Sequence, residues 1–146
     1  MAAPPLTTEL PLLLVTLGSW TENPDEEMVG GYLRQGYGYK SEWLTRSERT
    51  KHYQQIGESV AGWRKYTEKT VKNRGIEYAV AVHRGVTRAL LKIDPDSWES
   101  YGSGHDRRSA FAFEVVDSGP VFDQTVGPYG HRTPKREQNQ FYYPYR

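Results

Sequence analysis

Residues 76–93, IEYAVAVHRGVTRALLKI, decide the fold. Branched and aromatic side chains alternate with small or polar ones over residues 76–83, and a second alternating run covers residues 87–93. A period of two in runs rich in β-branched residues, interrupted at a glycine, predicts an antiparallel β-hairpin. We expect the apolar face of this hairpin to form the core of a sheet. Its Arg84–Gly85 turn is expected mainly to reverse the chain.

Length and composition favour one folded domain. The chain has 146 residues, which is enough for a single core, and we expect a mobile tail at residues 1–9 and one domain over residues 10–146. Aromatic residues make up 13% of the chain, which argues against intrinsic disorder. The mean hydropathy of −0.78 then predicts a small core built largely on rings.

Several classes of protein are disfavoured by what the sequence lacks. Without cysteine, disulfides and cysteine-based zinc sites are excluded, and a reducing cytoplasm is the expected location. The longest apolar run, residues 10–17, contains Pro11 and Thr16 and is too short to cross a bilayer. No basic segment precedes it, so no secretory signal is expected. We therefore expect no membrane contact and no metal or other cofactor.

Charge is distributed unevenly along the chain. Residues 1–33 contain acidic residues but no lysine or arginine, so all nineteen basic residues follow Leu33. Ordinary surface charge explains this pattern as well as a second interpretation does, in which a basic face contacts a polyanion and the acidic flank lies away from that polyanion.

The remaining patterns predict helices on a small sheet. A buried strand is expected at residues 10–17 and a short helix within Pro24–Gln35. Thr45 followed by Glu48 is a capping-box pattern, and an apolar stripe continues to Val71, so residues 45–73 are expected to form one helix, or two that break near Gly57–Gly62. Further strands are expected at residues 109–116 and, as an edge strand, at 141–145. The fold class is α+β: a small, mostly antiparallel sheet, curled or forming an open barrel, with flanking helices.

Catalytic motifs are weak in this sequence. There is no Walker lysine after either glycine motif and no G-x-S-x-G elbow. The histidines lack ligand-like spacing, and structural or surface roles are favoured for all of them: His52, His83, His105 and His131. An enzyme is therefore the less favoured class, although a small nuclease or toxin remains open, with four candidate residues: His105, Asp106, Arg107 and His131.

Basic residues interleaved with rings and glycines are the most informative pattern. Rings offer stacking surfaces to bases, and arginine or lysine contacts phosphates, so this combination predicts nucleic-acid binding. The candidate binding residues are Tyr39, Lys40, Trp43, Arg46, Trp98, His105, Arg107, Arg108, His131, Arg132, Lys135 and Arg136. Two other interpretations stay open: the rings simply build the core, or the exposed tyrosines contact another protein.

The order of these segments resembles a known superfamily. YAVAVHRGVTRALLKIDPDSW is followed by RRSAFAFEVV and by a terminal REQNQFYYPYR. This order is similar to that of small prokaryotic domains of the PUA-like superfamily, which includes the ASCH, EVE and YTH domains, and the similarity covers residues 12–145. The resemblance implies a curled sheet whose flanking helices form a pocket for a base of RNA or DNA, often a modified one. It also implies that Trp43, Arg46, Trp98 and Arg108 line this pocket.

Overall fold

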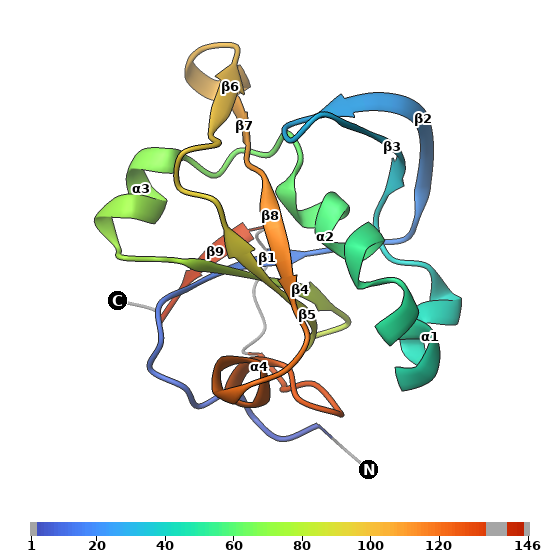
Figure 1. Cartoon of the computed structure of the whole chain (residues 1–146). Helices are drawn as coiled ribbons and strands as arrows, with labels where there is room; N and C mark the ends of the chain where they lie inside the picture. The colour runs from blue at the N-terminus through green and yellow to red at the C-terminus, as the bar shows by residue number, and fades with distance from the viewer. Residues whose placement is uncertain (1–2, 134–139, 145–146) are drawn as a thin grey trace.

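A five-stranded open sheet with helices on both faces forms the centre of the computed structural model, which describes residues 3–133 and 140–144 (Figure 1). The strand order is β8-β5-β4-β1-β9, and only β1 and β4 run parallel. Within the described residues the sheet does not close into a barrel, which agrees with the expected α+β class. The bounds of its strands are Leu12–Thr16 (β1), Tyr78–His83 (β4), Val86–Ile93 (β5), Phe113–Val116 (β8) and Gln140–Tyr143 (β9).

The predicted hairpin is confirmed as β4 and β5, joined by the two-residue turn Arg84–Gly85. Both turn residues have positive φ, +53° and +71° respectively, as in the tight turns whose twist matches a hairpin. The alternation is less regular than expected because the register shifts between Ala81 and Val82, which leaves Arg88 as an extra residue on β5. As a result Thr87 bonds to the α4 segment, while Leu91 faces α2 on the other side.

The strand predicted at residues 10–17 is confirmed as β1, and its first four residues are fully buried. β1 pairs with β4 on one side and with β9 on the other, so β9 is the edge strand that was expected near the end of the chain. Two helices cover the sheet: α2 (Tyr53–Ala61) lies on one face and α4 (Pro120–Thr125) on the other (Figure 1). The helix α4 was not expected.

The helix predicted within residues 24–35 is wrong. This region forms a two-stranded ribbon of β2 (Thr21–Met28) and β3 (Tyr32–Tyr37). The buried guanidinium of Arg34 holds the ribbon in place, since it pairs with Glu26 at 2.8 Å and donates to the backbone carbonyl of Glu58 in α2. This is a tertiary contact, which a local periodicity does not reveal.

The segment from Thr45 to Asn73 is helical but divided into three. A short 3₁₀ turn, η1 (Ser41–Leu44), precedes α1 (Arg46–Lys51), α2 and α3 (Glu68–Asn73). The N-cap half of the predicted capping box is confirmed, because the Thr45 hydroxyl accepts from the Glu48 amide at 3.4 Å. The Glu48 carboxylate contacts Lys51 and His52. The chain breaks at His52 and at Gly62. Gly57 lies inside α2, where a Cβ would come within 2.5 Å of the Phe113 ring, so its absence permits close helix–sheet packing.

The single strand predicted at residues 109–116 is also wrong. Residues 108–110 form β7 (Arg108–Ala110), which pairs with β6 (Glu99–Tyr101) in a separate ribbon, and β8 starts only at Phe113. Between them Phe111 turns into the core, where it is almost fully buried.

Residues 3–8, expected to belong to a tail, make defined contacts with the domain. The amide of Leu6 donates to the carbonyl of Arg132, whose own amide donates to Pro4, and the Leu6 side chain is buried. Across the described parts of the chain, none of the helices is both long enough and apolar enough to cross a bilayer.

Candidate functional site

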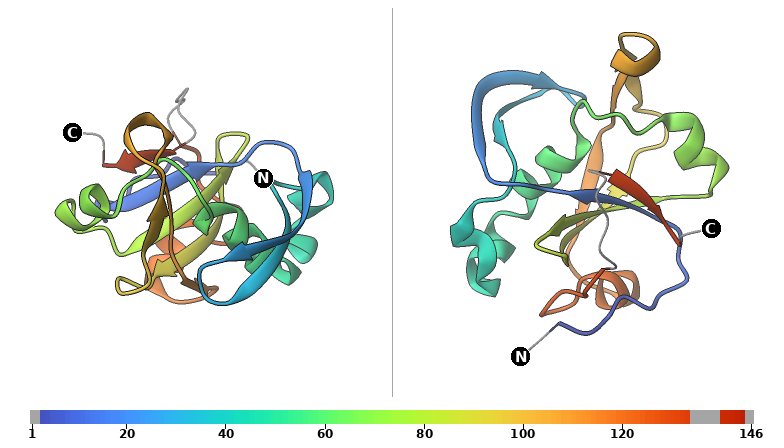
Figure 2. Two further views of the ribbon diagram at one scale, coloured as in Figure 1. Left: turned by 90° about the horizontal axis from the view of Figure 1, so that it is seen from above. Right: turned by 180° about the vertical axis from the view of Figure 1, so that it is seen from behind.

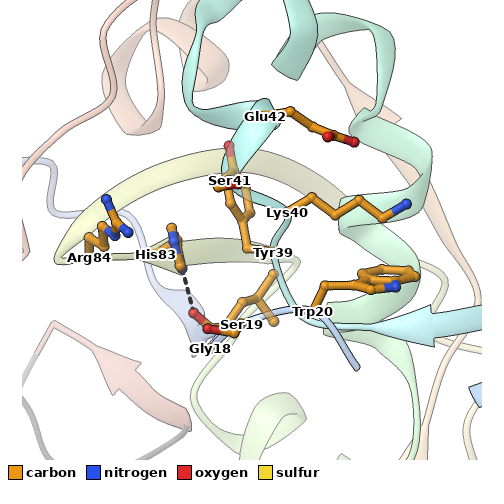
Figure 3. A pocket seen from close by; sticks show the side chains of 10 residues that line it. Gly18, Ser19, Trp20, Tyr39, Lys40, Ser41, Glu42, His83 and Arg84 are labelled. Atoms are coloured by element: carbon orange, nitrogen blue, oxygen red, sulfur yellow. Dashed lines mark hydrogen bonds between the residues drawn. The ribbon is translucent and has the colours of Figure 1, made fainter. Parts of the chain in front are cut away.

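A pocket of about 570 Å³ opens at the end of β4, where three chain segments meet (Figure 3). Residues 17–20 follow β1, residues 39–42 follow β3, and residues 83–84 are the last residue of β4 and the first of the β4–β5 turn. Because β1 and β4 are parallel neighbours, their C-terminal ends lie side by side, and the pocket forms directly outside them.

His83 forms part of the pocket wall in a fixed chemical state. Its ring is 8% exposed and stacks on Tyr39 with centroids 4.5 Å apart, while Nδ1 lies 2.7 Å from the carbonyl oxygen of Leu17. Since a carbonyl only accepts, Nδ1 must donate, so in the neutral ring Nε2 presents a lone pair. Burial lowers the pKa of His83 and is the largest influence on it; the bond to Leu17 raises the pKa, and the positive charges of Arg88 and Arg84 lower it further, so the net shift is downward. The ring is therefore neutral near pH 7, with Nε2 as a hydrogen-bond acceptor.

Tyr39 joins the pocket to the core. Burial raises its pKa to about 12, so the hydroxyl stays protonated and donates to the Trp43 carbonyl at 2.7 Å. The guanidinium carbon of Arg88 lies 5.8 Å from the centre of the Tyr39 ring. Two nitrogens of the same guanidinium donate to the carbonyl of His83. The wall of the pocket is thus fixed by packing and by backbone hydrogen bonds.

Trp43, predicted to contact the ligand, lies beneath the pocket instead. Its ring is 0% exposed and meets Trp20 and Tyr39 edge to face, with centroids 5.6 and 5.5 Å away. A ring with no exposed surface offers nothing to stack on. We therefore assign Trp43 to supporting the pocket, and Trp20, which the sequence analysis did not single out, supplies the half-buried ring at its edge.

Two cations flank the mouth of the pocket. The Lys40 ammonium lies 4.7 Å from the centre of the Trp20 ring, a cation–π geometry that Figure 3 shows directly. Arg84 is exposed on the hairpin turn. Among the described residues neither Lys40 nor Arg84 forms an ion pair with a carboxylate, although Glu42 also lines the pocket. These cations remain available for an anionic ligand.

Arg132 lies beside the same turn. It pairs with Val86 in an isolated bridge, and the next residue, Thr133, donates to the carbonyl of Gly85. His131 is half-buried, and its backbone amide donates to Thr87. The predicted positions Lys135 and Arg136 fall outside the described residues. Arg132 and His131 therefore lie next to the β4–β5 turn, whose Arg84 lines the pocket.

Arg46 lies on α1 next to the pocket region without lining the main pocket. It borders a smaller cavity of about 150 Å³ together with Tyr53, Asp117 and Pro128. The carboxylate of Asp117 makes this cavity a less favourable place for a phosphate.

The other predicted residues lie elsewhere in the fold. Trp98 is half-buried against Tyr66 and Phe111, where it helps to close the core. The remaining three belong to the β6–β7 ribbon and its loop: His105, Arg107 and Arg108. The structure thus distributes the described members of the predicted set over several regions and does not bring them into one pocket.

The alternative catalytic pair, His105 and Asp106, lies in the exposed 3₁₀ turn η2 (Gly104–Asp106) at the tip of that ribbon. Nowhere in the described ranges do three or more histidine or acidic side chains gather closely enough to hold a metal ion. No specific contact favours acid–base chemistry there.

His83 and Arg84 were missed as site residues because their partners are distant in sequence. One local signal was present, namely arginine at a turn position that normally favours Asn, Asp or Gly. Comparisons with protein-family models, with curated proteins and with solved structures gave no match to this chain.

Proposed function

We propose that the chain is a nucleic-acid-binding domain of PUA-like type, which takes one unstacked base of RNA or modified DNA into the pocket beside the β4–β5 turn. The observation that carries this proposal is that the Trp20–Lys40 pair and the His83 ring line one pocket, and that the cations at its mouth form no ion pair among the described residues. A base needs a ring surface and hydrogen-bonding groups, and its phosphates need cations. The volume of about 570 Å³ lies within the range of small-ligand sites.

The architecture supports the PUA-like part of the proposal without deciding it. The buried strand β1, the helices between β3 and β4, the β4–β5 hairpin, the strands β7 and β8, and the edge strand β9 follow one another in the order of segments on which the resemblance rests. In this proposal Lys40 and Arg84 hold the phosphates next to the bound base, and His83 accepts a hydrogen bond from a donor on the base edge.

The test is the binding of labelled single-stranded RNA and DNA, plain and modified, measured by fluorescence anisotropy at about 50 mM salt, where phosphate contacts are strongest. We expect Lys40→Ala and Arg84→Ala each to weaken binding and to reduce the slope of log affinity against log salt by about 0.7 per lost phosphate contact. The matched control is Lys92→Ala, which removes an exposed lysine of β5 remote from the pocket and should bind like the wild type.

Two outcomes contradict the proposal. One is the absence of binding to every strand, and the other is an equal loss in the Lys92→Ala control. Incubating the same strands with and without Mg²⁺ tests the enzyme alternative, because cleavage that disappears in His105→Ala would point to a nuclease.

A further inference from the structure

Trp63 occupies an unusual backbone conformation between two ribbons. Its φ is +46°, in the left-handed region that a bulky residue rarely adopts. Backbone pairing of Arg64 with Ser109 holds the chain beside β7, while the indole nitrogen of Trp63 donates to the carbonyl of Glu27 in β2. The half-buried ring is thereby fixed at the junction of the β2–β3 and β6–β7 ribbons, which rise on the same side of the sheet as α2 (Figure 1).

A second ring lies next to it with most of its surface open. Tyr101 is 57% exposed, and its ring centre lies 5.1 Å from that of Trp63 at 61°. Directly across the ribbon from Tyr101 is Arg108. A pair of rings beside an arginine is an arrangement on which successive bases stack in proteins that bind single strands.

Cations continue from this ring pair to α3. Arg107 and two lysines of α3, Lys69 and Lys72, line a groove of about 510 Å³. Lys72 is paired with Glu68 at 2.5 Å, but within the described parts of the chain Lys69 and Arg107 have no carboxylate partner. The groove can therefore accept the phosphates of a strand whose bases lie on the rings.

The distribution of acidic residues indicates which path over the surface the nucleic-acid strand would follow. Glu99 and Asp106 are exposed on the β6–β7 side, and Asp25 and Glu27 are exposed on the β2–β3 ribbon, which carries few cations. On the β6–β7 ribbon Arg107 and Arg108 balance the two acids, whereas the β2–β3 ribbon has an excess of acids over its one arginine. The path with the more favourable charge therefore leads from Tyr101 past Arg107 to Lys69.

We propose that Trp63 and Tyr101, together with the α3 groove, form a second contact surface for single-stranded nucleic acid. This inference rests on the proposed function of the pocket and extends it to the length of the ligand. The pocket lies at the C-terminal end of β4, and α3 lies near the N-terminal end of β4 (Figures 1 and 2). A β-strand of six residues, such as β4, spans about 20 Å. The ligand that uses both surfaces is a strand of several nucleotides, not a mononucleotide.

The test compares long and short strands in one anisotropy assay, with a labelled strand of about twelve nucleotides and unlabelled competitors of about three. We expect Tyr101→Ala to lower the affinity for the long strand about tenfold, which corresponds to the loss of one stacked base, and to leave the short strand unaffected. Tyr101→Phe keeps the ring and should bind like the wild type. Lys40→Ala should weaken both strands, because every strand uses the pocket.

Trp63→Gly provides an independent variant that removes the other ring without forcing a side chain into positive φ. Its fold is checked by circular dichroism, and it should show the same loss for the long strand. If both ring variants bind the long strand with the same affinity as the wild type, the second surface is refuted while the pocket proposal stands. A change in sedimentation of Tyr101→Ala without any change in strand binding would refute it too, because the rings would then contact protein. Failure of the wild type to bind any strand refutes the pocket proposal itself.

Discussion

The pocket at the C-terminal end of β4 and the β6–β7 ribbon use the same kinds of residue in opposite ways. At the pocket the rings of Tyr39 and Trp43 are buried, and Lys40 and Arg88 lie over ring faces. On the ribbon Tyr101 is exposed, and among the described residues the arginines beside it bond to neighbouring backbone or hydroxyl groups. Composition alone therefore does not define a binding residue. Packing makes the first region a preformed pocket and the second an open platform.

The pairing of the two regions with the five-stranded sheet explains this difference. The segments around the pocket follow strands of the five-stranded sheet or are bonded to it, for example through the Leu17 amide, which donates to the carbonyl of Val82 at 2.7 Å. The β6–β7 ribbon has only two short strands, and such ribbons have little stability of their own. We expect the pocket to be rigid and the platform to adjust to its ligand.

The largest contrast is expected between two tryptophans. Trp43→Ala removes a fully buried ring beneath the pocket and should lower the free energy of unfolding by about 3–5 kcal/mol, because it leaves a cavity that the core cannot fill. Trp63→Gly removes a half-buried ring and relieves positive φ, so its loss should be much smaller. Urea unfolding of the two variants measures both values. Equal losses would contradict the assignment of Trp43 to support and of Trp63 to the surface.

A smaller effect of opposite sign is expected at the hairpin turn. Arg84→Asn places a residue that tolerates positive φ at +53°, and should raise the free energy of unfolding by about 0.5–1 kcal/mol. The same change removes a cation from the pocket mouth, so strand binding should weaken. Thermal unfolding and anisotropy on one protein sample check the two effects together. A variant that gains stability without losing affinity would show that Arg84 is only a turn residue, and a variant that gains no stability would contradict the strain assigned to the turn.

The smallest predicted effect concerns pH. The pKa of His83 is lowered in the folded state, chiefly by burial, so the unfolded chain binds its proton more readily. This residue's contribution to stability is complete above about pH 6.5, the ordinary value for histidine, and is lost as the pH falls toward the lower folded value. His83→Gln should therefore lose less stability than the wild type between about pH 7.5 and pH 5. Melting temperatures of both proteins at the two pH values provide the measurement, and an identical drop would contradict the buried, neutral state of His83.

Local signals were sufficient for part of this fold. The β4–β5 hairpin and β1 followed from alternation and from an apolar run, because both patterns reflect burial of neighbouring residues in the strand itself. The β2–β3 ribbon had no such signal, since β2 is polar and mostly exposed and depends on Arg34 reaching α2. No local sequence pattern indicated the extra residue Arg88 in β5 or the helix break at His52.

The sequence predicted which types of residue take part in the site, but it did not predict how they are arranged. Tyr39 and Lys40 were identified from their composition as a ring and a cation in a glycine loop, and both line the pocket. His83 was not, because its role depends on Leu17, 66 positions away in the chain. The separation of the arginines of β6–β7 from the pocket likewise follows from the three-dimensional arrangement of the sheet.

The most direct test of the central claim is to locate a bound base on the protein. A single-stranded oligonucleotide with one photoreactive base is irradiated in complex with the wild-type chain, and the crosslinked peptides are identified by mass spectrometry. The account predicts crosslinks within residues 17–20, 39–42 or 83–84, and their loss when Lys40→Ala and Arg84→Ala are combined. Crosslinks confined to other parts of the chain, and unchanged in the double variant, would contradict it.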